Sequence, residues 1–252
     1  MKLFESMESL GHEQVVACYD KASGYRGIIA IHNTTLGPAL GGTRVWNYKS
    51  DDEAFFDVLR LSRGMTYKNA VAGLNLGGGK AVIIADNATA NRELIFRAHG
   101  RFVESLGGRY VTAEDVGTSP ADMDYVHMET DYVAGLENRS GDPSPVTAHG
   151  VFRSIEASAK WRWGSASLAG KTVVVQGIGH VGYFLCKELH AAGAKLIVAD
   201  IRKDKVDQVV KEFGAKATTD AAVYGEKADI FAPCALGAIL NDETIPQLKV
   251  EI

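Results

Sequence analysis

The chain has 252 residues, of which 46% are hydrophobic and 23% are charged, and its formal net charge is −4. These values indicate a globular protein with one large or two ordinary domains. Lys and Arg are spread along the chain, which gives no long-range attraction for nucleic acid or anionic membranes. We therefore expect no nucleic-acid partner, and no apolar run approaches the ~18 residues that a membrane span requires.

The cysteines and histidines follow no metal-binding or disulfide pattern. Cys18, Cys186 and Cys234 are odd in number and far apart, and the seven histidines form no metal-ligand motif. The first ten residues contain two glutamates where a signal peptide would have a basic start and an apolar core. We expect a cytoplasmic protein without a bound metal.

The first predicted strand is Tyr25–His32. The segment after it, Leu36–Thr43, is dense in glycine and other turn residues. Both a ligand-facing loop and a tight connection between strands fit this composition.

A helix is predicted to begin after Ser50, because the Ser50 hydroxyl can accept from the amide of Glu53 while Glu53 reaches back. The residues expected to face a core recur at helical spacing: Phe55, Val58, Leu59 and Ser62. The helix runs toward Lys68. A lysine at that position either complements the carbonyl end of the helix dipole or binds an anionic ligand.

The segment Ala72–Ala85 places three consecutive glycines directly before Lys80. Residues Ala81–Ala85 predict a buried strand, so Lys80 is expected at its start. Glycines allow a flat ligand to approach the backbone, and apolar surroundings lower the pKa of a lysine toward the range useful for proton transfer. The alternative is a glycine-rich turn followed by a solvated lysine.

A second helix is predicted at Asn91–Leu106 and a strand at Tyr110–Thr112, followed by Asp115. Ser119 and Pro120 form the cap and first turn of another helix. Ligands of open α/β sheets bind at the carboxyl ends of strands, which makes Asp115 a candidate site residue and not only a solvated loop acid. The alternation of strands and helices predicts an α/β domain.

The segment Asn138–Pro145 contains two prolines and no apolar periodicity, which predicts a linker. We place the domain boundary there, with residues 1–140 in the first domain and residues 141–252 in the second. A helix is predicted from about Thr147 and is expected to pack with the second domain.

The second domain carries a dinucleotide-binding pattern. The predicted strand Thr172–Gln176 leads directly into the G-x-G-x-x-G sequence of residues 177–182 and then into a helix. The next strand ends at Asp200, 18 residues after Gly182, which is about the spacing of a ribose-binding acid. A helix amino terminus favours the pyrophosphate, and an acid at this position favours NAD over NADP.

The remaining elements continue the same alternation. A helix is predicted at Lys203–Phe213, a strand at Asp229–Ala232, and the opening of a fourth strand at Leu248–Ile252. The predicted fold class is α/β with two domains.

Several segments together closely resemble the family of glutamate, leucine, phenylalanine and valine dehydrogenases. They are Leu36–Thr43, Arg60–Lys68, Gly77–Ile84, Thr112–Thr118, Pro145–Gly150 and Phe231–Gly237. The resemblance covers essentially the whole chain. It implies an N-terminal substrate-binding, catalytic and oligomerisation domain and a C-terminal Rossmann domain that binds NAD. Family members continue beyond the length of this chain, so we expect a chain truncated at its C-terminus, with an incomplete Rossmann domain.

The resemblance also implies roles for individual residues. Lys80 is the implied catalytic lysine, Asp115 its proton-relay partner, and Lys68 the group that grips the substrate carboxylate. Other implied substrate-binding residues are Leu40, Gly41, Met65, Gly77, Gly78 and Ala113. The implied cofactor-binding residues are Thr147, Gly177, Gly179, His180, Val181, Gly182, Asp200, Ile201, Cys234, Ala235 and Leu236.

The implied reaction is reversible NAD-dependent oxidative deamination of a branched-chain L-amino acid, such as leucine, to its 2-oxo acid and ammonia. Phenylalanine and valine are alternative substrates, because the loop around Thr43 differs in detail among these enzymes. A catalytically inactive nucleotide-binding fragment is the alternative from another class. The family resemblance further implies a homo-oligomer, a dimer or an octamer.

Overall fold

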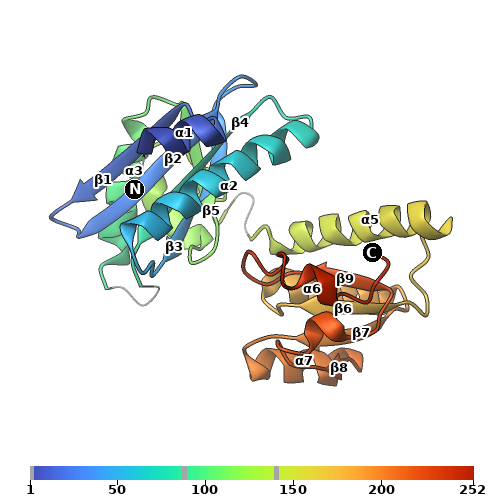
Figure 1. Ribbon diagram of the computed structural model, residues 1–252. Helices are drawn as coiled ribbons and strands as arrows, with labels where there is room; N and C mark the ends of the chain where they lie inside the picture. Colours follow the sequence, from blue (N-terminus) through green and yellow to red (C-terminus); the bar gives the residue numbers. More distant parts are fainter. Residues whose placement is uncertain (1–2, 87–89, 139–141) are drawn as a thin grey trace. The chain divides into compact units, whose positions relative to one another are not determined.

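The computed structural model describes residues 3–86, 90–138 and 142–252 (Figure 1). The chain divides into two compact units, Met1–Asp142 and Pro143–Ile252, and each has its own sheet and core. The predicted α/β fold class is confirmed. Residues 139–141 of the predicted linker lie outside the described part of the chain. In the described residues, no helix is long and apolar enough to cross a membrane.

The first unit contains a mixed sheet in the order β1-β2-β4-β3-β5. Its strands are β1 (Gln14–Asp20), β2 (Tyr25–Asn33), β3 (Ala39–Trp46), β4 (Gly77–Ile84) and β5 (Tyr110–Glu114). β1 and β2 are antiparallel to their neighbours, whereas β3 runs parallel to both β4 and β5. β3, β4 and β5 therefore all end at the same edge of the sheet.

Helices cover both faces of this sheet (Figure 1). Helix α2 (Asp51–Val71) packs on one face, where Val58 and Leu59 contact apolar residues of β2 and β4. Helices α3 (Arg92–Glu104) and α4 (Pro120–His127) lie on the other face over a larger apolar core. A short helix, α1 (Leu3–Leu10), precedes the sheet.

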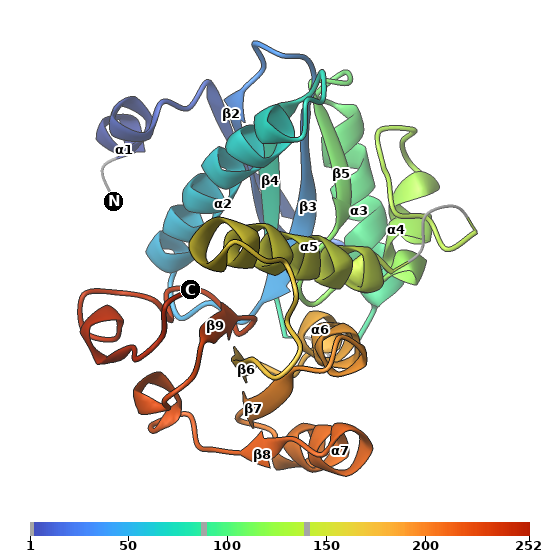
Figure 2. The same ribbon diagram turned by 90° about the vertical axis from the view of Figure 1, so that its right-hand side faces the viewer.

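The second unit is a parallel sheet in the order β8-β7-β6-β9. Its strands are β6 (Thr172–Gln176), β7 (Lys195–Ala199), β8 (Lys216–Ala217) and β9 (Ile230–Pro233). Helices α5 (Ser144–Trp163), α6 (His180–Ala191) and α7 (Lys203–Phe213) share one core with one face of the sheet, and α5 and α6 lie side by side (Figures 1 and 2). The short helix η1 (Val223–Gly225) and the segment around Leu248 cover the other face, and η2 (Ile245–Gln247) precedes that segment.

Local sequence signals predicted most helices well. Ser50 accepts a hydrogen bond from the Glu53 amide at the start of α2, although the Glu53 carboxylate accepts from the Lys49 amide and not from that of Ser50. The four predicted core residues of α2 are all buried. At α4, Ser119 and Asp122 form a complete capping box with Pro120 in the first turn. The predicted helix starting at Thr147 begins three residues earlier, at Ser144.

Five strand assignments differ from the prediction. The predicted loop Leu36–Thr43 is half strand, since β3 begins at Ala39. β4 begins at Gly77, so Lys80 lies inside the strand and not at its start. The two-residue β8 and the strand β1 were not predicted. The segment Leu248–Ile252 forms no regular strand, and only one isolated bridge joins Lys249 to Lys227.

Candidate active site

The glycines before Lys80 are strand residues in close contact with the rest of the protein. A side chain at Gly77 would lie 2.1 Å from the Asn33 carbonyl oxygen, and one at Gly78 would lie 2.1 Å from the amide of Thr66 in α2. None of the glycines in β4 has a positive φ. Close packing of β4 against α2 and β2 therefore accounts for the missing side chains. As a result, β4 lies directly against α2, and Lys80 is in the middle of β4.

Lys80 and Asp115 form a buried ion pair. The Lys80 Nζ lies 3.1 Å from the Asp115 Oδ1, and the two side chains are 6% and 23% exposed. Burial lowers the pKa of Lys80 below that of an ordinary lysine, although the charge of Asp115 opposes this shift. The positive charges of Arg44 and Lys68 add to the lowering. The expectation that Lys80 is desolvated is confirmed.

Asp115 follows the last residue of β5, as predicted, and remains ionised. Burial favours its neutral form, but the charges of Lys80 and Arg44 outweigh burial and hold the pKa of Asp115 below its ordinary value. The pair therefore combines a lysine that loses its proton more readily than usual with a carboxylate that keeps its charge. Such a pair can exchange protons with a substrate bound beside it.

Two residues of β3, Gly42 and Arg44, were missed by sequence reasoning because β3 was assigned partly to a loop. A side chain at Gly42 would lie 2.9 Å from the Asp115 Cβ and 2.3 Å from the Glu114 carbonyl oxygen. Arg44 donates from Nε to the Asp115 Oδ2 at 3.0 Å. The available signal was a charged residue, Arg44, between Thr43 and the apolar pair Val45 and Trp46, close after two glycines.

The predicted substrate-binding residues lie on or near the same three strands and α2. Leu40 is paired with Gly78, two residues before Lys80 in β4, and Ala113 is paired with the position of Gly42 in β3. Because alternate strand residues share a face, Leu40, Gly78, Lys80 and Ala113 face the same side of the sheet. Gly41 and Met65 are close neighbours, since a side chain at Gly41 would lie 3.1 Å from the Met65 Cγ. Lys68 is an exposed residue of the last turn of α2.

Thr43 does not take part in this face. It is buried, and its Oγ1 lies 2.7 Å from His99 Nε2 and 2.6 Å from Thr112 Oγ1. His99 also pairs with the Tyr25 hydroxyl. This polar cluster lies within the first unit's core, so Thr43 acts in packing between β3, β5 and α3.

The glycine-rich loop of the second unit has three glycines with different surroundings. Gly177 has a φ of +93°, and a side chain there would lie 2.4 Å from the Ala235 amide. A side chain at Gly182 would lie 2.0 Å from the Gly177 carbonyl oxygen. Gly179, the N-cap of α6, has open space around it. The first and third glycines therefore shape the turn, and the second leaves room for a ligand at the helix amino terminus.

The other predicted cofactor-binding residues surround this loop or the ends of neighbouring elements. The Asp200 carboxylate, at the end of β7, accepts from the amides of Ile178 and Arg202 at 2.5 and 2.7 Å. His180 and Val181 begin α6, and Ile201 is 87% exposed. The predicted residues after β9 are Cys234, Ala235 and Leu236, of which Ala235 is the neighbour of Gly177. Thr147 is exposed in the first turn of α5.

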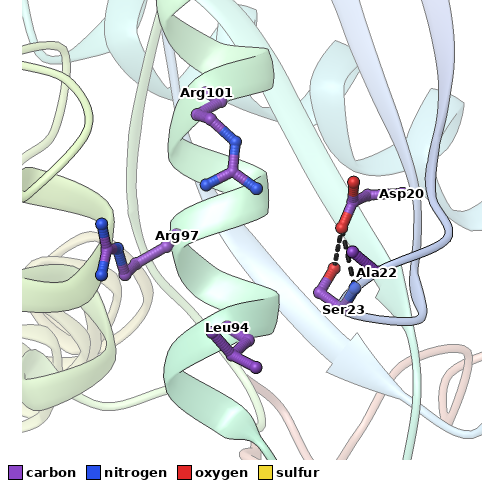
Figure 3. A pocket seen from close by; sticks show the side chains of 6 residues that line it. All are labelled: Asp20, Ala22, Ser23, Leu94, Arg97 and Arg101. Carbon is purple, nitrogen blue, oxygen red and sulfur yellow. Dashed lines mark hydrogen bonds between the residues drawn. The ribbon is translucent and has the colours of Figure 1, made fainter.

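A separate hollow of about 230 Å³ lies between α3 and the turn that joins β1 to β2 (Figure 3). Its arginines are already engaged, since Arg97 pairs with Glu129 at 2.7 Å and Arg101 lies 3.5 Å from the same carboxylate. Asp20 accepts from the amide and hydroxyl of Ser23. None of the predicted site residues lines this hollow. In the part of the chain that the structure describes, no cluster of His, Cys, Asp or Glu could hold a metal ion.

Comparison with known proteins shows the family to which this chain belongs. Residues 12–132 match the model of the Glu/Leu/Phe/Val dehydrogenase dimerisation domain. The chain is 60% identical to the leucine dehydrogenase of Geobacillus stearothermophilus, over all of this chain and 70% of that protein. It is 50% identical to the valine dehydrogenase of Streptomyces coelicolor, over 99% of this chain and 70% of the relative.

A solved structure agrees with these matches. The crystal structure of L-tryptophan dehydrogenase from Nostoc punctiforme superposes with a TM-score of 0.72 at 46% identity, covering 98% of this chain and 71% of that one. The chain belongs to the Glu/Leu/Phe/Val dehydrogenase family, as its motifs predicted. It is an oxidoreductase of the amino-acid dehydrogenase class.

Proposed function

We propose that this protein catalyses the reversible NAD-dependent oxidative deamination of a branched-chain L-amino acid, with leucine as the preferred substrate. The observation that carries the proposal is the buried ion pair between Lys80 and Asp115. A buried lysine with a lowered pKa beside a carboxylate is suited to proton transfer at a carbon that changes between amine and carbonyl. The relative from Geobacillus stearothermophilus, at 60% identity, supports leucine.

In the proposed substrate site, Lys68 binds the carboxylate of the amino acid as a point charge. Its charge already acts on Lys80, which supports a position close to the reacting group. Leu40 and Ala113 line the pocket for the substrate side chain, on the same side of the sheet as Lys80. Gly41, Met65, Gly77 and Gly78 complete the proposed set, in which the closely packed glycines fix the backbone beside Lys80.

Features of the second unit support the proposal that it binds the nucleotide part of NAD. Open space at Gly179, the N-cap of α6, suits a pyrophosphate at the amino end of the helix dipole. We propose that Asp200 accepts a hydrogen bond from a ribose hydroxyl, which favours NAD over NADP. The other proposed contacts are Gly177, His180, Val181, Gly182, Ile201, Cys234, Ala235 and Leu236, and we place Thr147 near the nicotinamide.

In the proposed reaction, bound NAD supplies the acceptor for the hydride that leaves the substrate Cα. Lys80, in its neutral form, removes a proton from the water that adds to the resulting imine. Asp115 exchanges protons with the substrate amino group and with the tetrahedral intermediate as ammonia leaves. Because the protein holds these groups beside the reacting carbon, the proton transfers do not depend on an encounter between separate molecules in solution. Because residues 12–132 match a dimerisation domain, we include self-association into a dimer or an octamer in the proposal.

An absorbance assay for NADH with L-leucine tests the proposal. Replacing Lys80 with alanine should lower kcat by roughly 10²-fold or more, the usual contribution of a positioned acid or base, while NAD binding persists. Unchanged turnover in this variant would remove Lys80 from the proposed role. Absence of NADH formation by the unmodified chain would favour a silent nucleotide-binding module, and a panel of leucine, valine and phenylalanine would establish the preferred substrate.

A further inference from the structure

Each oxygen of the Asp115 carboxylate contacts a different cation. Its Oδ1 lies 3.1 Å from Lys80 Nζ, and its Oδ2 accepts from Arg44 Nε at 3.0 Å. Both oxygens are therefore fixed, so the carboxylate cannot rotate without losing a partner. The Arg44 side chain is 16% exposed, which means that most of this charge is shielded from solvent.

Arg44 is itself anchored from the other side. Its Nη1 donates to the Asp57 Oδ2 at 2.9 Å, and Asp57 projects from α2. The Tyr48 hydroxyl donates to the same Asp57 oxygen, and Arg60 donates to the other oxygen. One guanidinium thus bridges a carboxylate on the helix and a carboxylate after β5. A planar, forked donor can span two carboxylates in this way, and a lysine ammonium cannot reproduce the geometry.

The strand register places Arg44 beside the reacting pair. Arg44 in β3 is paired with Val82 in β4, two residues after Lys80, so Arg44 and Lys80 face the same side of the sheet. That side is the one covered by α2, which supplies Asp57. The bridge therefore joins three elements of the fold: β3, α2 and the end of β5.

We propose that Arg44, anchored by Asp57, is a positioning residue that fixes the carboxylate of Asp115 against Lys80. The proposal rests on the proposed function, in which Lys80 and Asp115 carry out the proton transfers. Arg44 acts through Asp115 and needs no contact with the substrate.

The electrostatic effects of Arg44 are consistent with this role. Arg44 from β3 and Lys68 from α2 are the cations that act on Lys80, besides the charge of Asp115. Arg44 in turn faces Asp57 of α2, which also pairs with Arg60 and accepts from the neutral Tyr48 hydroxyl. Burial has the largest effect on the pKa of Asp115 and raises it, and the charge of Lys80 lowers it. The charge of Arg44 lowers it further. It also adds to the lowering of the pKa of Lys80, for which burial is the main cause. Removing the Arg44 charge should therefore raise both pKa values.

The test compares Arg44→Met, Arg44→Lys and Asp57→Asn with a matched control in the full chain. Arg26→Met is the control, because Arg26 pairs with Asp51 at 2.7 Å on the exposed surface of the same unit. For each variant, kcat and KM for L-leucine are measured across pH, together with the NAD Kd and the thermal unfolding curve. Competitive acetylation of Lys80 across pH, followed by mass spectrometry, reports the state of Lys80 without requiring turnover.

We expect Arg44→Met to lower kcat by roughly 10- to 100-fold, a range typical of residues that orient a reacting group, with a smaller change in KM. The acid limb of kcat/KM and the midpoint of Lys80 acetylation should both move to higher pH. Compared with Arg44→Met, Arg44→Lys should recover part of the shift in the pH profile but little of kcat. The kcat of Asp57→Asn should lie between that of Arg44→Lys and that of the unmodified chain. Arg26→Met should change none of these values.

Two results would overturn the proposal. One is unchanged kcat and pH profile in Arg44→Met, and the other is lost activity with an unaltered Lys80 acetylation profile, which would make Arg44 merely structural. If Arg44→Met fails to fold, Arg44→Lys decides the question by the same measurements. If the unmodified chain shows no activity, the proposed function fails, and the acetylation profile alone decides whether Arg44 controls the Lys80–Asp115 pair.

Discussion

Lys80 and Asp115 form their ion pair across an intervening strand. Lys80 lies in β4 and Asp115 follows β5, whereas β3 lies between these strands in the sheet. The two side chains meet because the intervening position, Gly42, has no side chain. A Cβ on Gly42 would lie 2.9 Å from the Asp115 Cβ, closer than packed carbon atoms tolerate. The candidate active site therefore depends on a glycine that carries no chemistry of its own.

Replacing Gly42 with alanine should separate Lys80 from Asp115. The new methyl group would lie 2.3 Å from the Glu114 carbonyl oxygen, so the backbone of β5 must move. We expect kcat to fall by roughly 100-fold and the free energy of unfolding to fall by about 1–3 kcal/mol, the usual cost of overpacking. Gly64→Ala in α2 is the control, since open space surrounds Gly64. Equal activity in the two variants would show that the pair tolerates displacement.

The directions of the pKa shifts predict how activity depends on pH. The Lys80 pKa lies below its ordinary value, so kcat/KM should rise with pH through a midpoint below about 10.4, the value of a free lysine. Asp115→Asn removes the charge that opposes this lowering, so its residual activity should show a midpoint at still lower pH. Its kcat should fall by roughly 10²- to 10⁴-fold. Asp131→Asn, at a side chain that is 96% exposed, should leave the profile unchanged.

Local patterns were sufficient to predict helices such as α2, because Ser50 and the apolar spacing act within a few residues. The dinucleotide loop could also be predicted, because its glycines lie between a strand and a helix that adjoin in sequence. β3 was partly missed because glycines are poor strand formers, yet the hydrogen bonds of β4 and β5 on both sides hold this segment extended. The contact from Arg44 to Asp115 joins positions 71 residues apart, and only the strand register brings them together.

His99, which is fully buried in the first unit, predicts loss of stability in acid. Burial lowers the pKa of His99 to about 3, and His99 lies between the Tyr25 and Thr43 hydroxyls. The unfolded chain binds a proton near pH 6.5, so below that pH it binds more protons than the folded chain. The contribution of His99 to the free energy of unfolding is complete above pH 6.5. It is lost as pH falls toward 3, by about 1.4 kcal/mol per pH unit.

His99→Gln tests this dependence by urea unfolding at pH 7 and pH 4.5. The variant should be less stable at pH 7, because it loses part of the hydrogen-bonded cluster, but its stability should fall less between the two pH values. His190→Gln, at an exposed position of α6, should retain the pH dependence of the unmodified chain. An unchanged pH dependence in His99→Gln would mean that another group governs acid unfolding.

The glycines of the dinucleotide loop should separate cofactor binding from folding. Gly179 has a φ of −72° and open space around it, so Gly179→Ala should fold with a near-normal Tm. Its methyl group would occupy the space proposed for the pyrophosphate, and we expect the Kd for NAD to rise by roughly 10-fold or more, the effect of about 1.4 kcal/mol.

Gly182→Ala places a Cβ 2.0 Å from the Gly177 carbonyl oxygen, so it should lower both the Tm and the affinity for NAD. Gly225→Ala, with open space and no part in the loop, should alter neither. Titration calorimetry with NAD and thermal unfolding measure the two quantities separately. If Gly179→Ala binds NAD with unchanged affinity, the pyrophosphate does not lie at the start of α6.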